Sequence, residues 1–290
     1  MQLIIDISSD FMLYLIIASS FSICYRVLGF FHMAHAASLT IAAYLVYTTH
    51  ILWTLPFWLS VLLSVVFVVF LMVVIHKCIY LPGKTRNLEG WQLMVISLGV
   101  YVVLQNVVSM IWGDSTLTFR TWTVKQGHPI LGGSITDVQI VTILVSALLL
   151  LCVWLLLEKT NTGMRLKAVS SNPSLSTILG VRWETVASFS IALGTVLMAC
   201  AGILIAADVD MTPTMGFDWL LYGVVAMIIG GMGRMRYMVL GALLLATAQH
   251  LAAYFLDSKW MNATAYVILI IFLCFRPYGF SGRKLKKTEV

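Results

Sequence analysis

The sequence predicts an all-α integral membrane protein that crosses the bilayer about nine times. Of its 290 residues, 60% are hydrophobic and only 10% are charged. A soluble domain of this length needs far more charge on its surface. The apolar residues also gather in stretches of about 20 residues, the length at which a helix spans the hydrocarbon core of a bilayer.

Nine apolar segments predict the spans, and a count of eight to ten stays open. The first two segments are separated only by Gly29 and Phe30, and the seventh and eighth only by Gly-Met-Gly-Arg-Met-Arg. Such tight breaks also suit re-entrant or broken helices. We expect a single transmembrane domain over residues 1–290. The predicted spans are 11–29, 31–48, 52–76, 91–112, 138–157, 184–206, 215–232, 237–256 and 262–276.

The basic residues predict the orientation of the chain, because cytoplasmic loops carry an excess of Lys and Arg. They gather between spans three and four, five and six, and seven and eight, and in the C-terminal tail. With nine spans these places share one side, so we expect the N-terminus outside and the C-terminus in the cytoplasm. The net charge of +6 therefore does not indicate a nucleic acid partner. The residues are Lys77, Lys84, Arg86, Arg165, Lys167, Arg182, Arg234, Arg236, Arg283, Lys284, Lys286 and Lys287.

One long polar interruption, Thr160–Val181, divides the apolar second half of the chain. Its local signals predict one or two short helices. Asn172 suits an N-cap, Pro173 suits the first helical position, and Gly180 suits a left-handed stop. The whole predicted cytoplasmic loop covers about residues 159–182.

Charge and apolar side chains in this loop predict a docking element. Arg165 and Lys167 supply the charge, and Leu175, Ile178 and Leu179 supply an apolar edge. A helix lying flat at the cytoplasmic face could present both to a partner. The spacing alone fits a solvated connector equally well.

The sequence contains no catalytic motif, and no acidic residue falls near the middle of a predicted span. Proton-coupled carriers usually keep an ionisable relay at that depth, so a self-powered carrier is disfavoured. His32 and His35, at the start of span two, lack a third ligand of suitable spacing, so we expect no metal site.

Polar residues inside the spans are the candidates for a solute path. For any single residue, hydrogen bonding between helices is the favoured interpretation. The alternative is a polar path for a small zwitterionic or uncharged solute. The path candidates are His32, His35, Ser38, Gln105 and Asn106, and Gln249 and His250 are further polar residues in span eight.

Four stretches resemble the LivH-type permease subunits of ABC importers for branched-chain amino acids. G-F-F-H-M-A-H-A-A-S-L-T-I-A-A-Y (Gly29–Tyr44) is similar to the family's Gly-Leu-x-Asn-Phe-Ala-His-Gly run ending in Gly-Ala-Tyr. S-L-G-V-Y-V-V-L-Q-N-V-V-S-M-I-W-G (Ser97–Gly113) follows its L-G…L-Q-N…W-G. T-G-M-R-L-K-A-V-S-S-N-P, followed by L-G-V, resembles its T-x-x-G-x-x-x-R-A-x-x-x-N-P…L-G-I. The fourth stretch runs from M-G-F at 215–217 through G-G-M-G to F-R-P-Y-G at 275–279.

The resemblance implies a subunit of a larger machine in the bacterial inner membrane. Such permeases pair with a second related permease, two cytoplasmic ATPase subunits and an extracytoplasmic solute-binding protein. The third stretch resembles the coupling helix that seats on an ATPase, which assigns coupling to Arg165, Lys167, Asn172, Pro173, Leu175, Leu179 and Gly180. The chain itself would be no enzyme and hold no cofactor, because the partner ATPases would bind ATP and Mg.

Departures from the family pattern leave the solute open. His32 stands where relatives commonly have Asn, and Tyr222 falls about where many carry Lys. Amino acids are the first expectation, and urea or short amides, which close cousins handle, are the alternative. A stand-alone ion-coupled carrier or channel is the alternative from another class.

Overall fold

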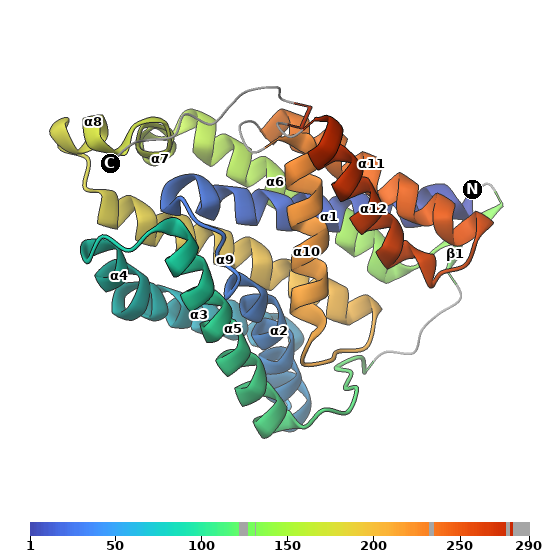
Figure 1. The fold of residues 1–290 in the computed structure, drawn as a ribbon. Coiled ribbons are helices and arrows are strands. Elements are labelled where there is room, and N and C mark those ends of the chain that lie inside the picture. The colour runs from blue at the N-terminus through green and yellow to red at the C-terminus, as the bar shows by residue number, and fades with distance from the viewer. Residues whose placement is uncertain (122–126, 131, 232–234, 277–278, 281–290) are drawn as a thin grey trace. The chain divides into compact units, whose positions relative to one another are not determined.

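A computed structural model describes residues 1–121, 127–130, 132–231, 235–276 and 279–280, and within them the regular structure is helical apart from one short hairpin (Figure 1). The remaining residues lie outside this description. They include 232–234, in the predicted break between spans seven and eight, and the four basic residues of the tail.

Contacts divide the chain into two compact units. The first comprises Met1–Ser22, Trp122–Leu149 and Trp219–Val290, and the second comprises Ile23–Thr121 and Leu150–Asp218. Three helices continue from one unit into the other: α1 (Gln2–Leu28), α6 (Asp137–Lys159) and α10 (Met215–Gly230). The single domain expected from the sequence stays a prediction.

Helix α2 (His35–Tyr47) is the core of the second unit. It packs against α3 (Phe57–Ile75), α5 (Gly90–Trp112) and α9 (Trp183–Asp208). Its residues are buried almost all around, which small side chains such as Ala36 and Ala42 permit. The α2–α9 contact is so close that a Cβ on Gly202 would lie 2.3 Å from the carbonyl oxygen of Leu39.

Two of these helices contain wider π-helical turns. After α2 the chain continues as η1 (Thr48–Leu52), and after α3 it continues as η2 (His76–Tyr80) and α4 (Leu81–Thr85). Single π turns inside helices occur frequently at functional sites. Before α2 the chain breaks at Gly29, whose φ of +78° ends α1 in the left-handed region.

The first unit is built on contacts between α10, α11 (Met235–Phe255) and α12 (Trp260–Phe275), and on the start of α1. Helix α11 packs against α12. A Cβ on Gly241 would lie 2.2 Å from the carbonyl oxygen of Ala226, so α10 and α11 approach backbone to backbone. The ring of Tyr14 in α1 packs at a tilt against that of Tyr222 in α10, with centroids 5.6 Å apart.

The predicted spans correspond to apolar helices whose lengths differ. Among the described residues, six helices are long and apolar enough to cross a membrane. Helices α10 and α12 are shorter apolar helices, and α2 has 13 residues. The chain is thus a multi-pass membrane protein, while the count of nine and the orientation stay predictions. The six are Gln2–Leu28, Phe57–Thr85, Gly90–Trp112, Asp137–Lys159, Trp183–Asp208 and Arg236–Phe255.

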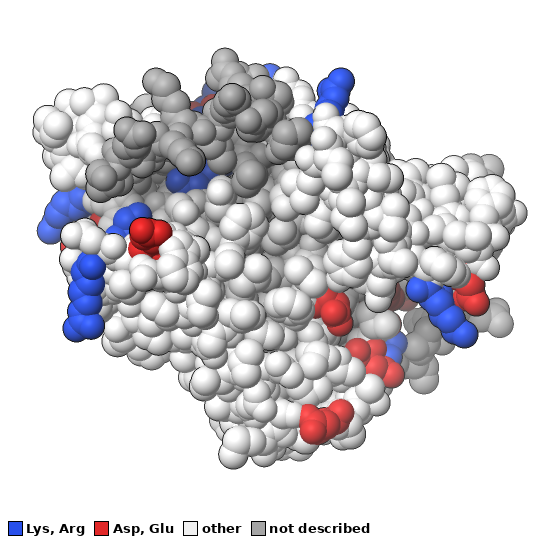
Figure 2. Space-filling view, in the orientation of Figure 1, with Lys and Arg blue, Asp and Glu red and all other residues white. Residues whose placement is uncertain are grey.

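The outward faces of these helices are apolar. Met110 of α5 is 85% exposed, and Phe70 of α3 and Leu144 of α6 are also exposed. Figure 2 shows how few charged side chains reach the described part of the surface in this view. Such an apolar surface is suited to contact with lipid.

Between α5 and α6 the chain forms a short hairpin that the sequence did not indicate. Strands β1 (His128–Ile130) and β2 (Gly133–Ile135) pair antiparallel, with His128 opposite Ile135. In the second unit, Leu117 forms a bridge with Met211, and Arg120 donates a hydrogen bond of 3.0 Å to the carbonyl of Asp208.

Candidate functional site

The polar loop folds as two short helices, α7 (Asn161–Ser171) and α8 (Pro173–Ile178), as its local signals predict (Figure 1). The Asn172 side chain accepts a hydrogen bond of 3.0 Å from the backbone N–H of Leu175 and caps α8. Pro173 takes the first helical position. Gly180 follows α8 with a φ of +82°. The capping predictions are therefore confirmed, while the docking role stays a prediction.

Helix α7, the first helix of the polar loop, packs closely against the helices that flank the loop. Leu166 and Val169 are buried, and α7 packs against α9. A Cβ on Gly163 would lie 2.5 Å from the carbonyl oxygens of Leu156 and Leu157 at the end of α6. The loop is therefore held against the helices on either side of it in the chain.

The apolar edge of α8 is open on the surface. Leu175, Ile178 and Leu179 are exposed, and Ile178 is 81% exposed. Three large apolar side chains spaced at i, i+3 and i+4 share one helix face. Contiguous exposed apolar patches mark surfaces that contact a protein or a membrane.

The two predicted docking cations lie in different surroundings. The Lys167 ammonium forms a 2.8 Å ion pair with Glu158 at the end of α6. Both side chains are about half exposed, so this pair contributes at most about 1 kcal/mol. Arg165 instead lines a surface pocket together with Arg182 and Leu179, beside the exposed edge.

The predicted path residues His32, His35 and Ser38 are brought together and fully buried. The rings of His32 and His35 meet edge to face with centroids 5.8 Å apart. The Ser38 hydroxyl donates a 2.6 Å hydrogen bond to the carbonyl of His35. These residues occupy the break after α1 and the first turn of α2.

Two residues that the sequence reasoning missed join this group. Tyr80 lies with its ring centroid 4.8 Å from that of His32, and His76 lies 6.5 Å from Tyr80. Both sit on the π-helical turn η2 and both are buried. A histidine and a tyrosine four residues apart at the end of a predicted span were the available signal, since residues at that spacing share a helix face.

Gln105 and Asn106 do not join the buried histidines. Asn106 is exposed, and its amide donates a 2.7 Å hydrogen bond to the carbonyl of Val102 in its own helix. Gln105 is partly exposed. The face of α5 that reaches the backbone around His32 carries Ser97, whose hydroxyl accepts from the N–H of Met33 at 3.0 Å and lies 3.2 Å from the carbonyl oxygen of Phe31.

The end of α1 connects the polar loop to this break. Trp183, the first residue of α9 after the loop, donates its indole N–H to the carbonyl of Val27 at 3.2 Å. Lys84 donates to the carbonyl of Leu28 at 3.3 Å and lies 4.7 Å from the centroid of the Trp183 ring. Because the last carbonyls of a helix lack helical partners, these side chains complete the end of α1.

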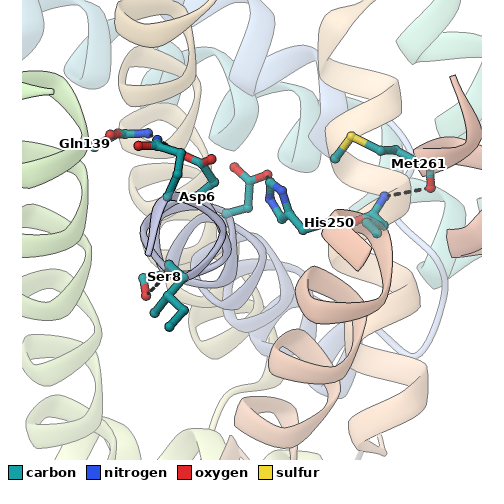
Figure 3. A network of polar contacts seen from close by, with 9 residues as sticks. Asp6, Ser8, Gln139, His250 and Met261 are labelled. Carbon is teal, nitrogen blue, oxygen red and sulfur yellow. Dashed lines mark hydrogen bonds and ion pairs between the residues drawn. The ribbon is translucent and has the colours of Figure 1, made fainter. Parts of the chain in front are cut away.

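A separate polar network lies in the first unit (Figure 3). The His250 ring lies 2.9 Å from a carboxylate oxygen of Asp10, and the amide of Gln139 donates to Asp6 at 3.1 Å. Gln249 donates to the carbonyl of Met261 at 3.2 Å. These bonds join α1, α6, α11 and α12, so hydrogen bonding between helices is confirmed for His250 and Gln249.

Tyr222 is also engaged within the first unit. Its hydroxyl donates to the Asn262 side chain at 2.5 Å, and its ring packs on Tyr14 and Trp219. This residue therefore ties α10 to α12 through a hydrogen bond between side chains.

Comparisons with curated proteins find the same relatives that the motifs indicate. The high-affinity branched-chain amino acid transport system permease protein LivH of Salmonella typhimurium is 22% identical, over 93% of this chain and 91% of its own. BraD of Pseudomonas aeruginosa, a permease protein of the same description, is 24% identical over 93% and 92%. The probable branched-chain amino acid transport permease LivH of Methanocaldococcus jannaschii is 27% identical over 72% and 69%.

A solved structure shares the fold. The chain superposes on PsaBC from Streptococcus pneumoniae in complex with Fab with a TM-score of 0.53, covering 99% of this chain and 95% of that one. The sequences are 14% identical, so this likeness concerns the fold alone.

The family model described as branched-chain amino acid transport system / permease component matches residues 3–274. That range includes the break between α1 and α2 with its histidines, the capped polar loop and, apart from Gln2, all six long apolar helices. The chain therefore belongs to the family of branched-chain amino acid transport permeases.

Proposed function

We propose that this permease forms the membrane path of a bacterial ABC importer for small amino acids, with branched-chain amino acids as the first candidates. Partner ATPase subunits dock on α7 and α8, a second related permease completes the path, and an extracytoplasmic protein delivers the solute. The family match over residues 3–274 carries this proposal. The partner ATPases bind ATP and Mg and supply the energy.

The exposed edge of α8 supports the docking of an ATPase. Leu175, Ile178 and Leu179 present apolar area on a helix that Asn172 and Gly180 fix at its two ends. Apolar anchors that fill a partner's groove carry most of the free energy of a protein interface. Arg165, at the margin of this edge, adds a cation that steers a partner of complementary charge.

The contacts of Trp183 support a route by which docking moves the path. A displacement of α8 acts on α9, because the loop between them is only four residues long and α9 begins at Trp183. The hydrogen bond from Trp183 to Val27 then acts on the end of α1, next to the break that contains His32. Packed helices sliding or hinging in this way are a common form of switching.

The position of Asp10 bears on the alternative of a stand-alone carrier. Helix α1 begins nearer the N-terminus than the predicted first span, so Asp10 lies about two turns inside the helix. Paired acid and histidine side chains also occur in proton relays. The Asp10–His250 pair is nonetheless part of a network that ties helices together, and the docking edge of α8 favours the ABC importer.

Uptake into vesicles tests the solute class. We expect membrane vesicles that contain the full importer to accumulate leucine, isoleucine or valine when ATP is supplied, and we expect a protonophore to leave this uptake unchanged. Urea and acetamide serve as competitors in the same assay. Competition by urea alone would move the solute class to amides, and uptake driven by a proton gradient without ATP would refute the importer.

A further inference from the structure

Three buried side chains in the second unit have polar atoms without a protein partner. Both ring nitrogens of His32, both ring nitrogens of His76 and the hydroxyl of Tyr80 find no hydrogen-bond partner among the described residues. These side chains are 2%, 0% and 1% exposed. A buried polar group without a hydrogen bond costs about 1–3 kcal/mol, so five such atoms together indicate a ligand that satisfies them.

The three groups lie close to one another and come from two irregular segments. His32 belongs to the break between α1 and α2, and its ring centroid lies 4.8 Å from that of Tyr80. His76 and Tyr80 stand at the two ends of η2, with centroids 6.5 Å apart. Phe30 covers this group, 5.5 Å from Tyr80, and Trp183 covers it 6.4 Å from His76.

The chemistry of the five atoms selects the ligand. A neutral imidazole offers one donor and one acceptor, and a phenol hydroxyl does the same. A carboxylate only accepts and an ammonium only donates, so either would leave part of the group unmatched. Among the described residues no three His, Cys, Asp or Glu side chains have an arrangement that could hold a metal ion. The matching ligand is uncharged and both donates and accepts.

We propose that His32, His76 and Tyr80 form an internal binding site for a small uncharged hydrogen-bonding group, which ordered water supplies. Buried waters typically make about three hydrogen bonds to polar groups that protein leaves unsatisfied. Ordered water here links the break after α1 to the π turn η2. The site thus gives the break after α1 and the π turn η2 a shared set of hydrogen bonds. Because water supplies them, these bonds can exchange, whereas direct bonds between side chains would fix the two segments to each other.

The zwitterionic end of an amino acid also donates and accepts hydrogen bonds, but through an ammonium and a carboxylate rather than through one uncharged group, so we expect water to be the occupant. The experiment therefore has two arms, one without solute and one with a mixture of leucine, isoleucine and valine. The second arm depends on the proposed function. The first arm tests the site without reference to it.

X-ray hydroxyl-radical footprinting of the purified full chain, with the subunits that co-purify, tests the site. Radicals formed from bound water oxidise the side chains that touch it, even where bulk solvent has no access. We expect Tyr80 to be oxidised several-fold faster, relative to its intrinsic reactivity, than Phe21, which is 0% exposed. Free amino acids also scavenge radicals, so the rate for Tyr80 is compared with that for the exposed Tyr254. Slowing of Tyr80 beyond that of Tyr254 identifies the solute as the occupant, and equal slowing identifies water.

Two variants separate this site from general loosening of the fold. His76→Leu removes both ring nitrogens and is expected to reduce oxidation of Tyr80 several-fold. Ser60→Ala removes another buried, unpartnered polar atom on α3, more than four turns away along the chain, and is expected to leave Tyr80 unchanged. Oxidation of Tyr80 in the unmodified protein at the rate of Phe21 would show a dry cluster and overturn the proposal.

Discussion

Leu175→Asp and Ile178→Asp are expected to abolish most solute-stimulated ATP hydrolysis while leaving the permease in the membrane. Both side chains are exposed on the same face of α8, so a carboxylate there costs the permease little stability. In the complex, the same carboxylate would enter an apolar groove without a partner. Loss of an interface anchor costs about 2 kcal/mol or more, which weakens binding about thirtyfold.

The measurement is ATP turnover of the reconstituted complex with and without solute. Ser174→Asp is the matched control, because it places the same charge on an exposed residue in the first turn of α8 and removes no apolar side chain. Turnover close to normal in Leu175→Asp and Ile178→Asp would remove the docking role from α8. Equal loss in Ser174→Asp would assign the effect to charge rather than to the apolar edge.

Gly202→Ala is expected to lower the thermal stability of the protein strongly although it adds a single methyl group. The new Cβ would lie 2.3 Å from the carbonyl oxygen of Leu39 and 2.9 Å from its Cα. Both contacts are to backbone, so α2 and α9 must separate. Overpacking of this kind typically costs about 1–3 kcal/mol.

Gly99→Ala is the matched control for this substitution. Gly99 also lies inside a long helix, α5, but a Cβ there meets nothing within 4 Å. Ala gains about 0.5–1 kcal/mol over Gly in a helix interior, so this variant should be as stable as the parent or more so. Size-exclusion chromatography after heating gives the comparison. Equal melting of the two variants would contradict the close α2–α9 contact.

The polar loop was predictable from sequence because its signals are local. Asn172, Pro173 and Gly180 determine the ends of α8 through a side-chain cap, a fixed φ and a left-handed residue, none of which depends on tertiary contacts. The apolar spans were predictable for a similar reason, since hydropathy alone separates lipid-facing helices from loops.

The approach of His76 and Tyr80 to His32 was not predictable in the same way. His76 and Tyr80 meet His32 because α3 continues through a π turn instead of ending at the predicted boundary of residue 76. A π turn widens one turn of the helix and has no sequence signature comparable to a cap. The start of α1 was missed because Asp6 and Asp10 lower the local hydropathy. Their partners Gln139 and His250 are distant in sequence.

A pull-down of the tagged chain in mild detergent, with identification of the co-purified subunits and assay of ATP hydrolysis, tests most directly whether this permease belongs to an ABC importer. We expect recovery of ATPase subunits and a second permease, with hydrolysis stimulated by solute and its binding protein. We also expect Leu175→Asp to release the ATPase subunits and Ser174→Asp to retain them. Recovery of this chain alone, inert toward ATP yet active in solute transport, would show that it is not a subunit of an ABC importer.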